Sequence, residues 1–157
     1  MLKKYAFLDR DGTLIFEPQN TFQIDSIEKL KILPGVLDGL KKLKKNGYEL
    51  IMVSNQDGLG TPSFPLKKFQ EAQFAMLKIF EGNGIKFDEI FICPHLFEDE
   101  CECRKPKTGL VQKFLENNVI DLDCSFMCGD RYSDREFAAN LGIRYVPVKT
   151  NGSFKNV

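Results

Sequence analysis

The chain has little of several features that mark other classes of protein. Its 157 residues include no tryptophan and a single histidine. No apolar run approaches the length that spans a bilayer, and the basic residues near the N-terminus are followed too soon by acidic ones for a signal peptide. Lysine plus arginine and aspartate plus glutamate each number 22, so the formal net charge is zero. We therefore expect a cytoplasmic protein that binds neither a membrane nor a nucleic acid, although a local basic pocket is still compatible with this balance.

The overall composition is that of an ordinary globular protein. Hydrophobic residues make up 43% of the chain and charged residues 28%. A chain of this length favours a single domain, over residues 1–157, with a core large enough to fold unaided. In a reducing compartment, the five cysteines are expected to be metal ligands or buried thiols rather than disulfides. Cys124 and Cys128 lie in or beside an apolar run and are predicted to be core thiols.

Short apolar runs alternate with segments in which apolar residues recur at helical spacing, such as Val36, Leu40 and Leu43. This alternation predicts an α/β fold with a doubly wound parallel sheet. Residues 11–33 show no clear period and are expected to form a flap beside the first strand. The predicted strands are Tyr5–Leu8, Leu50–Ser54, Glu89–Cys93, Ser125–Cys128 and Arg144–Val146.

Acidic side chains follow the first predicted strand directly. Asp9 and Asp11 have the same side-chain parity on an extended chain, so both carboxylates leave the strand end on one side. They would repel each other unless a cation neutralised them, and a site with only oxygen ligands suits Mg²⁺. One carboxylate could attack a phosphoryl group while the other transfers the proton. The ordinary alternative for an Asp-x-Asp pair is two solvated turn residues, so the other polar segments decide between these interpretations.

Those segments follow other predicted strands, and ligands of open α/β sheets bind beyond the carboxyl ends of the strands. Together they favour phosphoryl transfer, with Asp9 as nucleophile and Asp11 as general acid and base. Ser54, assisted by Asn55, is expected to bind phosphoryl oxygens, and Lys105 to supply a positive charge to them. The predicted Mg²⁺ ligands are Asp9, Asp11 and Asp130, with Asp134 as a supporting carboxylate.

A second metal site is predicted in residues 93–103, which contain the pattern Cys-x-His-x₅-Cys-x-Cys. Four soft or borderline ligands within this short loop suit a closed tetrahedral Zn²⁺ with no open position for chemistry. We expect the zinc to order a polar loop and to hold Lys105 in place. The alternative, a nucleic-acid-binding zinc module, is disfavoured by the zero net charge and the single short cluster. The predicted zinc ligands are Cys93, His95, Cys101 and Cys103.

Four segments resemble the motifs of the haloacid dehalogenase superfamily of phosphatases, and the resemblance covers residues 5 to 147 of the chain. It implies a Rossmann-like core, Mg²⁺ dependence and an aspartyl-phosphate intermediate formed on Asp9. The segment between the first two motifs is too short for a folded cap domain in addition to a helix, so a capless fold with an open site is expected. The four segments are Leu8–Thr13, Val53–Asn55, Lys105–Pro106 and Gly129–Asp134.

Within the superfamily, residues 55–65 and 129–131 resemble the histidinol-phosphate phosphatase branch of histidine biosynthesis. That branch is fused to a dehydratase domain in several bacteria, so the chain is either monofunctional or the N-terminal part of a longer protein. Histidinol phosphate carries an amine, and Glu17 is the predicted carboxylate for it, with Gln23 and Asp57 next. The alternatives are a heptose-bisphosphate phosphatase, which carries a similar cysteine loop, and a catalytically silent scaffold, which the full set of expected catalytic residues disfavours.

Overall fold

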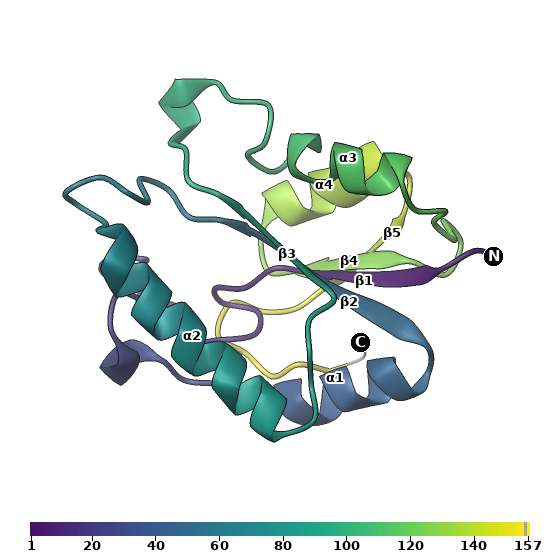
Figure 1. Ribbon diagram of the computed structural model, residues 1–157, viewed down its shortest axis with the longest axis horizontal. Helices are drawn as coiled ribbons and strands as arrows, with labels where there is room; N and C mark the ends of the chain where they lie inside the picture. The colour runs from purple at the N-terminus through teal and green to yellow at the C-terminus, as the bar shows by residue number, and fades with distance from the viewer. Residues whose placement is uncertain (156) are drawn as a thin grey trace.

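The computed structural model describes residues 1–155 and 157 of the chain. Its five strands form one parallel sheet in the order β3-β2-β1-β4-β5 (Figure 1). Each predicted strand is present, and its observed ends differ from the predicted ones by no more than two residues. The strands are β1 (Lys4–Leu8), β2 (Tyr48–Asn55), β3 (Glu89–Cys93), β4 (Phe126–Gly129) and β5 (Arg144–Pro147).

The central strand β1 pairs with β2 on one side and with β4 on the other, with Phe7 opposite Ile51 and Met127. From β1 the chain adds β2 and β3 in one direction, and then returns to add β4 and β5 in the other. The sheet is therefore doubly wound, as predicted. Its order reverses at β1, so residues that follow β1 lie at the point where ligands of such sheets bind.

Helices cover both faces of the sheet (Figure 1). Two of them pack on the face that Ala6 and Leu8 of β1 present, and the other two on the face of Tyr5 and Phe7. Because both faces are covered, the strands are apolar on both sides, which explains their continuous hydrophobic runs. The first pair is α1 (Val36–Lys45) and α2 (Leu66–Gly82), and the second is α3 (Gly109–Glu116) and α4 (Tyr132–Leu141).

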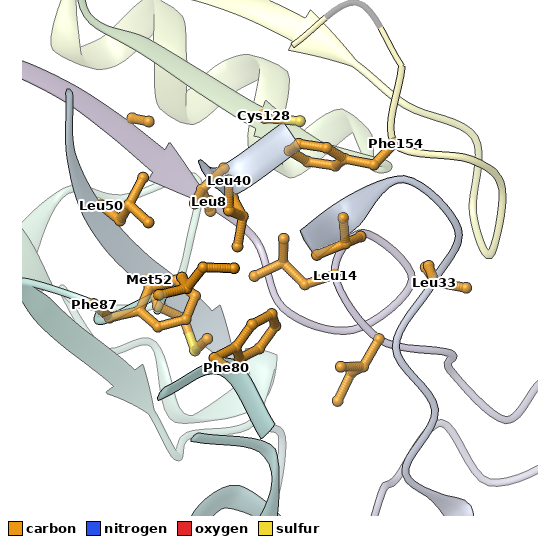
Figure 2. Close-up of a cluster of buried hydrophobic side chains, with 14 of the residues drawn as sticks. Leu8, Leu14, Leu33, Leu40, Leu50, Met52, Phe80, Phe87, Cys128 and Phe154 are labelled. Atoms are coloured by element: carbon orange, nitrogen blue, oxygen red, sulfur yellow. The ribbon is translucent and has the colours of Figure 1, made fainter. Parts of the chain in front are cut away.

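The larger hydrophobic cluster lies between the sheet and the first helix pair (Figure 2). Leu40 of α1 and Phe80 of α2 pack there with Leu8, Leu50 and Met52 from the two central strands, and all five side chains are fully buried. Burial of a side chain of this size stabilises a fold by roughly 1.5–3 kcal/mol. The cluster therefore fixes the end of β1, on which the functional residues depend.

Residues 11–33 differ from the flap that the sequence led us to expect. Leu14, Ile15, Ile24 and Leu33 are buried and belong to the same hydrophobic cluster as α1 and α2. Their backbone follows an irregular path with one short 3₁₀ helix, η1 (Ile27–Lys29), so their apolar residues have neither helical nor strand spacing. The segment is therefore anchored in the core at these four residues, whereas residues 19–22 are exposed, and residues 21–23 line a pocket.

Two smaller expectations can also be compared with the structure. Cys128 is fully buried, as predicted for a core thiol, but Cys124 is only partly buried because it lies in the turn before β4. Within residues 1–155 and 157, no helix has the length and apolar character needed to cross a membrane.

Candidate active site

Asp9 follows β1 directly and is 7% exposed. Its Oδ1 accepts a hydrogen bond from Lys105 Nζ at 2.8 Å, and its Oδ2 accepts one from the Thr13 hydroxyl at 3.2 Å. Burial by itself would raise the pKa of Asp9, but the Lys105 ammonium and its hydrogen bond hold that pKa below the ordinary value. Lys105 therefore favours the ionised form of Asp9 at the carboxyl edge of the sheet, which is the form that a nucleophile needs.

Asp130 and Asp134 lie beside Asp9, and one carboxylate oxygen of each falls within 4.8 Å of the others. Burial and the nearby Asp9 raise the pKa of Asp130 to about 7 and that of Asp134 to about 6. Asp130 approaches closely because residue 12 is a glycine with φ +82°, where a Cβ atom would stand 2.6 Å from Asp130 Oδ2. Such crowded carboxylates suit a divalent cation with oxygen ligands, and the site fits Mg²⁺.

Lys105 is the cation that the protein itself supplies to this cluster. Its side chain is 2% exposed, and Nζ donates to Asp134 Oδ1 at 2.7 Å as well as to Asp9. Burial opposes its charge, but the two carboxylates outweigh burial and raise its pKa. The Asn55 amide holds the Lys105 backbone in both directions, at 3.1 Å and 2.9 Å. In the structure Asn55 thus positions Lys105, and its predicted contact with phosphate stays a prediction.

Asp11 lies in a different environment from Asp9. Arg10 Nη1 donates to its Oδ1 at 2.9 Å, and Gln56 Nε2 donates to its Oδ2 at 2.9 Å. Burial raises the pKa of Asp11, although Arg10 and Gln56 oppose the shift. A carboxyl group with a raised pKa beside an ionised one is the arrangement expected for an acid and a nucleophile. The side chain points to these donors, so its predicted role as a Mg²⁺ ligand stays a prediction.

A pocket of about 440 Å³ opens over these groups. Asp9, Asp11, Lys105 and Asp134 line it, and so do residues 21–23, which include the predicted Gln23. Ser54 is 1% exposed and lies beneath this surface, where its Oγ accepts a hydrogen bond from Gln56 Nε2 at 2.8 Å. The predicted phosphate-binding serine is therefore next to the pocket, covered by the side chain of Gln56.

The carboxylates predicted for amine recognition, Glu17 and Asp57, both line the pocket, and each already has a cationic partner. Arg131 Nη2 contacts Glu17 Oε1, and Arg104 makes two hydrogen bonds to Asp57, of 2.9 Å and 3.2 Å. Burial raises the pKa of Glu17, and Arg131 opposes this shift. The lining as a whole is acidic, because its carboxylates outnumber its cations: Asp9, Asp11, Glu17, Asp57 and Asp134 against Arg104, Lys105 and Arg131.

The four residues predicted to bind zinc converge beside β3. Cys93 Sγ lies 3.1 Å from Cys103 Sγ and 3.7 Å from Cys101 Sγ, and His95 Nδ1 lies 3.2 Å from Cys103 Sγ. All four ligand atoms fall within 4.8 Å of one another, as the corners of a tetrahedral Zn²⁺ site would. Burial raises the pKa of Cys93 to about 12, so a thiolate there needs a cation. The donor set fits Zn²⁺.

Sequence reasoning did not single out several residues that shape the site. Thr13 bridges Asp9 and Asp130, and Thr150 donates to Asp130 Oδ2 at 2.7 Å. Gln56 follows directly on Ser54 and Asn55, so its place after a predicted strand was a usable signal. Arg10 lies between the two predicted catalytic aspartates. Thr150 lies beyond the last motif, and no local pattern marks it.

Comparison with known proteins shows the family to which the chain belongs. A family profile described as polynucleotide kinase 3 phosphatase matches residues 4–149. The D,D-heptose 1,7-bisphosphate phosphatase from B. bronchiseptica, solved with magnesium and phosphate, has a similar structure. Its TM-score is 0.84 at 28% sequence identity, with 97% of this chain and 83% of that one covered.

Curated relatives are more similar in sequence. The histidine biosynthesis bifunctional protein HisB of Actinobacillus pleuropneumoniae is 53% identical over 95% of this chain, and that of Campylobacter jejuni subsp. doylei is 51% identical over 92%. HisB of Legionella pneumophila is 47% identical over 99%. The chain spans only 41% to 44% of the length of these proteins. The chain has the haloacid dehalogenase type of fold, with a five-stranded parallel sheet, and belongs to the polynucleotide kinase 3 phosphatase family.

Proposed function

We propose that the chain is a Mg²⁺-dependent phosphomonoesterase that converts histidinol phosphate to histidinol. The observation that carries the phosphatase proposal is the hydrogen bond from the buried Lys105 to Asp9, together with the separate hydrogen bond from Gln56 to Asp11. The named substrate is supported by the three HisB proteins, which are 47% to 53% identical to this chain. Residues 1–157 would act as one phosphatase domain in the cytoplasm.

The proposed reaction has two halves. Asp9 attacks phosphorus, the bond from phosphorus to the ester oxygen breaks, and the leaving alkoxide takes a proton from Asp11. A water molecule then attacks the aspartyl-phosphate and gives its proton to Asp11, while the bond from phosphorus to Asp9 breaks. Lys105 stabilises negative charge on the phosphoryl oxygens in both halves. Ser54, which lies beneath Gln56, would donate its hydroxyl hydrogen to a phosphoryl oxygen only after a local movement of that side chain.

Asp9 and Asp130 would hold Mg²⁺, with Asp134 in support. When bound, the metal would neutralise charge on the phosphoryl group. Thr13 and Thr150 orient Asp130 toward this position. Cys93, His95, Cys101 and Cys103 would hold Zn²⁺, which would keep the loop that precedes Lys105 in a single conformation.

Two carboxylates of the pocket lining lie outside the proposed metal site, Glu17 and Asp57, and these support a cationic leaving group. Glu17 is the proposed partner of the substrate amine, with Gln23 and Asp57 close by on the pocket wall. The amine would share Glu17 with Arg131, because each carboxylate oxygen can accept more than one hydrogen bond.

The second candidate substrate is a heptose bisphosphate, which the structural similarity to the B. bronchiseptica enzyme favours. The B. bronchiseptica enzyme is 28% identical to this chain, whereas HisB of C. jejuni is 51% identical. Since the chain covers 41% of the C. jejuni protein, we also propose that it works as the phosphatase part of a longer protein, with a dehydratase as the second part.

Steady-state kinetics on a panel of phosphate esters tests the substrate. The panel contains histidinol phosphate, heptose 1,7-bisphosphate, p-nitrophenyl phosphate and an oligonucleotide with a 3′-phosphate. We expect kcat/KM to be highest for histidinol phosphate and turnover to require Mg²⁺. Preference for the heptose ester or the oligonucleotide would reassign the substrate. Absence of Mg²⁺-dependent turnover on every ester would favour the silent scaffold.

A further inference from the structure

Gln56 makes an unusual set of contacts for a residue outside the proposed chemistry. Its side chain is 2% exposed, and the same Nε2 atom donates to Asp11 Oδ2 at 2.9 Å and to Ser54 Oγ at 2.8 Å. An amide nitrogen carries two hydrogens, so these two bonds use both of them. Gln56 is thus hydrogen-bonded both to Asp11, the proposed general acid and base, and to Ser54, the proposed phosphate-binding residue.

Backbone hydrogen bonds fix the position of Gln56. Its backbone N–H donates to the carbonyl of Cys93 at 2.8 Å, and the N–H of Gly58 donates to the carbonyl of Pro94 at 3.1 Å. These bonds attach the segment after β2 to the start of the loop that carries the cysteine cluster. These two backbone hydrogen bonds therefore hold the segment from which the Gln56 side chain reaches Asp11.

The contacts also leave Asp11 free to react. Arg10, which is fully buried and lies over the Phe69 ring, takes a lone pair of Oδ1, and Gln56 takes one of Oδ2. A carboxylate has about four lone-pair directions, so one on each oxygen remains for the proton that moves. With both oxygens held, the carboxyl group cannot rotate about its own axis.

We propose that Gln56 is a positioning residue that orients Asp11 for proton transfer to the leaving oxygen and from the attacking water. This inference rests on the proposed two-step phosphatase reaction, but not on the identity of the substrate. Loss of the amide leaves Asp11 present and misoriented. A displacement of about 1 Å in such a group lowers a rate by about 100-fold.

The dependence of the rate on the leaving group separates this role from a structural one. An alkyl ester needs a proton on its leaving oxygen, whereas p-nitrophenolate leaves as a stable anion. With Gln56→Met, which keeps a side chain of similar volume without the amide, kcat for an alkyl phosphate such as glycerol 3-phosphate should fall by about 10- to 100-fold. Formation of the aspartyl-phosphate from p-nitrophenyl phosphate should stay within about threefold of wild type, because that step needs little acid catalysis.

The second half-reaction still needs Asp11 as a base with either ester. Stopped-flow measurement with p-nitrophenyl phosphate should therefore show a burst of nitrophenolate in Gln56→Met, close to one equivalent per active site, followed by slow turnover. Circular dichroism melting verifies that the variant folds. Gln56→Leu provides the same test if the methionine variant is unstable.

Gln73→Met is the matched control, because Gln73 lies on α2 and its Nε2 contacts Met52 Sδ at 3.9 Å, away from the pocket. It should change neither rate by more than about twofold. Two results would overturn the proposal: rates within twofold of wild type for Gln56→Met on both esters, or equal losses on both without a burst. Failure of the wild type to prefer histidinol phosphate would contradict the proposed substrate and leave this test unchanged.

Discussion

Replacement of Lys105 by methionine tests the electrostatic account of the site. Lys105 Nζ stands 2.8 Å from Asp9 and 2.7 Å from Asp134, and all three side chains are at least 90% buried. Methionine keeps the length of the side chain and removes its charge. Removal of one partner from a buried ion pair costs about 3–5 kcal/mol, since a charge is left uncompensated. We therefore expect Lys105→Met to lower the free energy of unfolding by about 3 kcal/mol or more at pH 7.

The penalty should depend on pH in a defined direction. The pKa of Asp134 is already raised to about 6, and without Lys105 it should rise further. A carboxyl group whose folded pKa lies above its unfolded value loses stability as pH rises between the two values. Through Asp134 the wild type loses no further stability above about pH 6, whereas the variant does. One pH unit is worth about 1.4 kcal/mol per proton, so the penalty should be about 1 kcal/mol smaller at pH 5 than at pH 7.

Urea unfolding followed by circular dichroism, without added magnesium, measures both values, because the chain has no tryptophan for fluorescence. Lys107→Met is the matched control: its side chain is 48% exposed and its nearest carboxylate is 3.6 Å away, so its cost should be under about 0.5 kcal/mol. A Lys105→Met penalty below about 1 kcal/mol, or one that is equal at the two pH values, would refute the assignment of Lys105 as the cation between two buried ionised carboxylates.

Three further outcomes are expected. Protons should compete with Mg²⁺ at Asp130, whose pKa is about 7, so titration calorimetry should show the Kd for Mg²⁺ rising by about tenfold from pH 8 to pH 6; a constant Kd would contradict Asp130 as a ligand. Elemental analysis should find about one zinc atom per chain in the wild type; Cys101→Ser should lose this zinc, whereas Cys124→Ser should retain it, and a zinc-free wild type purified without chelator would contradict the zinc site. Glu17→Gln should lower kcat/KM for histidinol phosphate by an amount that corresponds to a loss of about 1–3 kcal/mol in transition-state stabilisation, and should leave p-nitrophenyl phosphate almost unaffected; equal losses on both esters would move amine recognition to another residue.

The fold was predictable because its signals are local. Each strand of the sheet is a short apolar run, and polar residues that follow the runs mark the carboxyl edge where the site lies. Asp9 and Asp130 could be predicted to lie together in this way, since both follow parallel strands that end at one edge, whereas Lys105 was indicated by its motif with Pro106. The four zinc-site residues were predictable from spacing alone, because they lie in a single loop.

Other features depend on contacts between distant segments. Residues 14–33 contribute to the core through an irregular path, and irregular paths leave no periodic pattern in a sequence. Thr150 reaches Asp130 from beyond the last motif. The ion pairs of Glu17 with Arg131 and of Asp57 with Arg104 join residues more than 40 positions apart. No local pattern in the sequence therefore indicates that either carboxylate has a cationic partner. Gln56 was visible as a polar residue after a strand, but its shared contact with Asp11 and Ser54 required the tertiary structure.

The central claim is that Asp9 forms a covalent phosphoryl intermediate. Borohydride reduces an aspartyl-phosphate to homoserine, so rapid quenching of the enzyme during turnover of histidinol phosphate, followed by reduction and peptide mass spectrometry, locates the reacting residue. We predict homoserine at position 9, dependent on both Mg²⁺ and substrate, and none in Asp9→Asn. Homoserine at another aspartate, or full turnover by Asp9→Asn, would contradict the account.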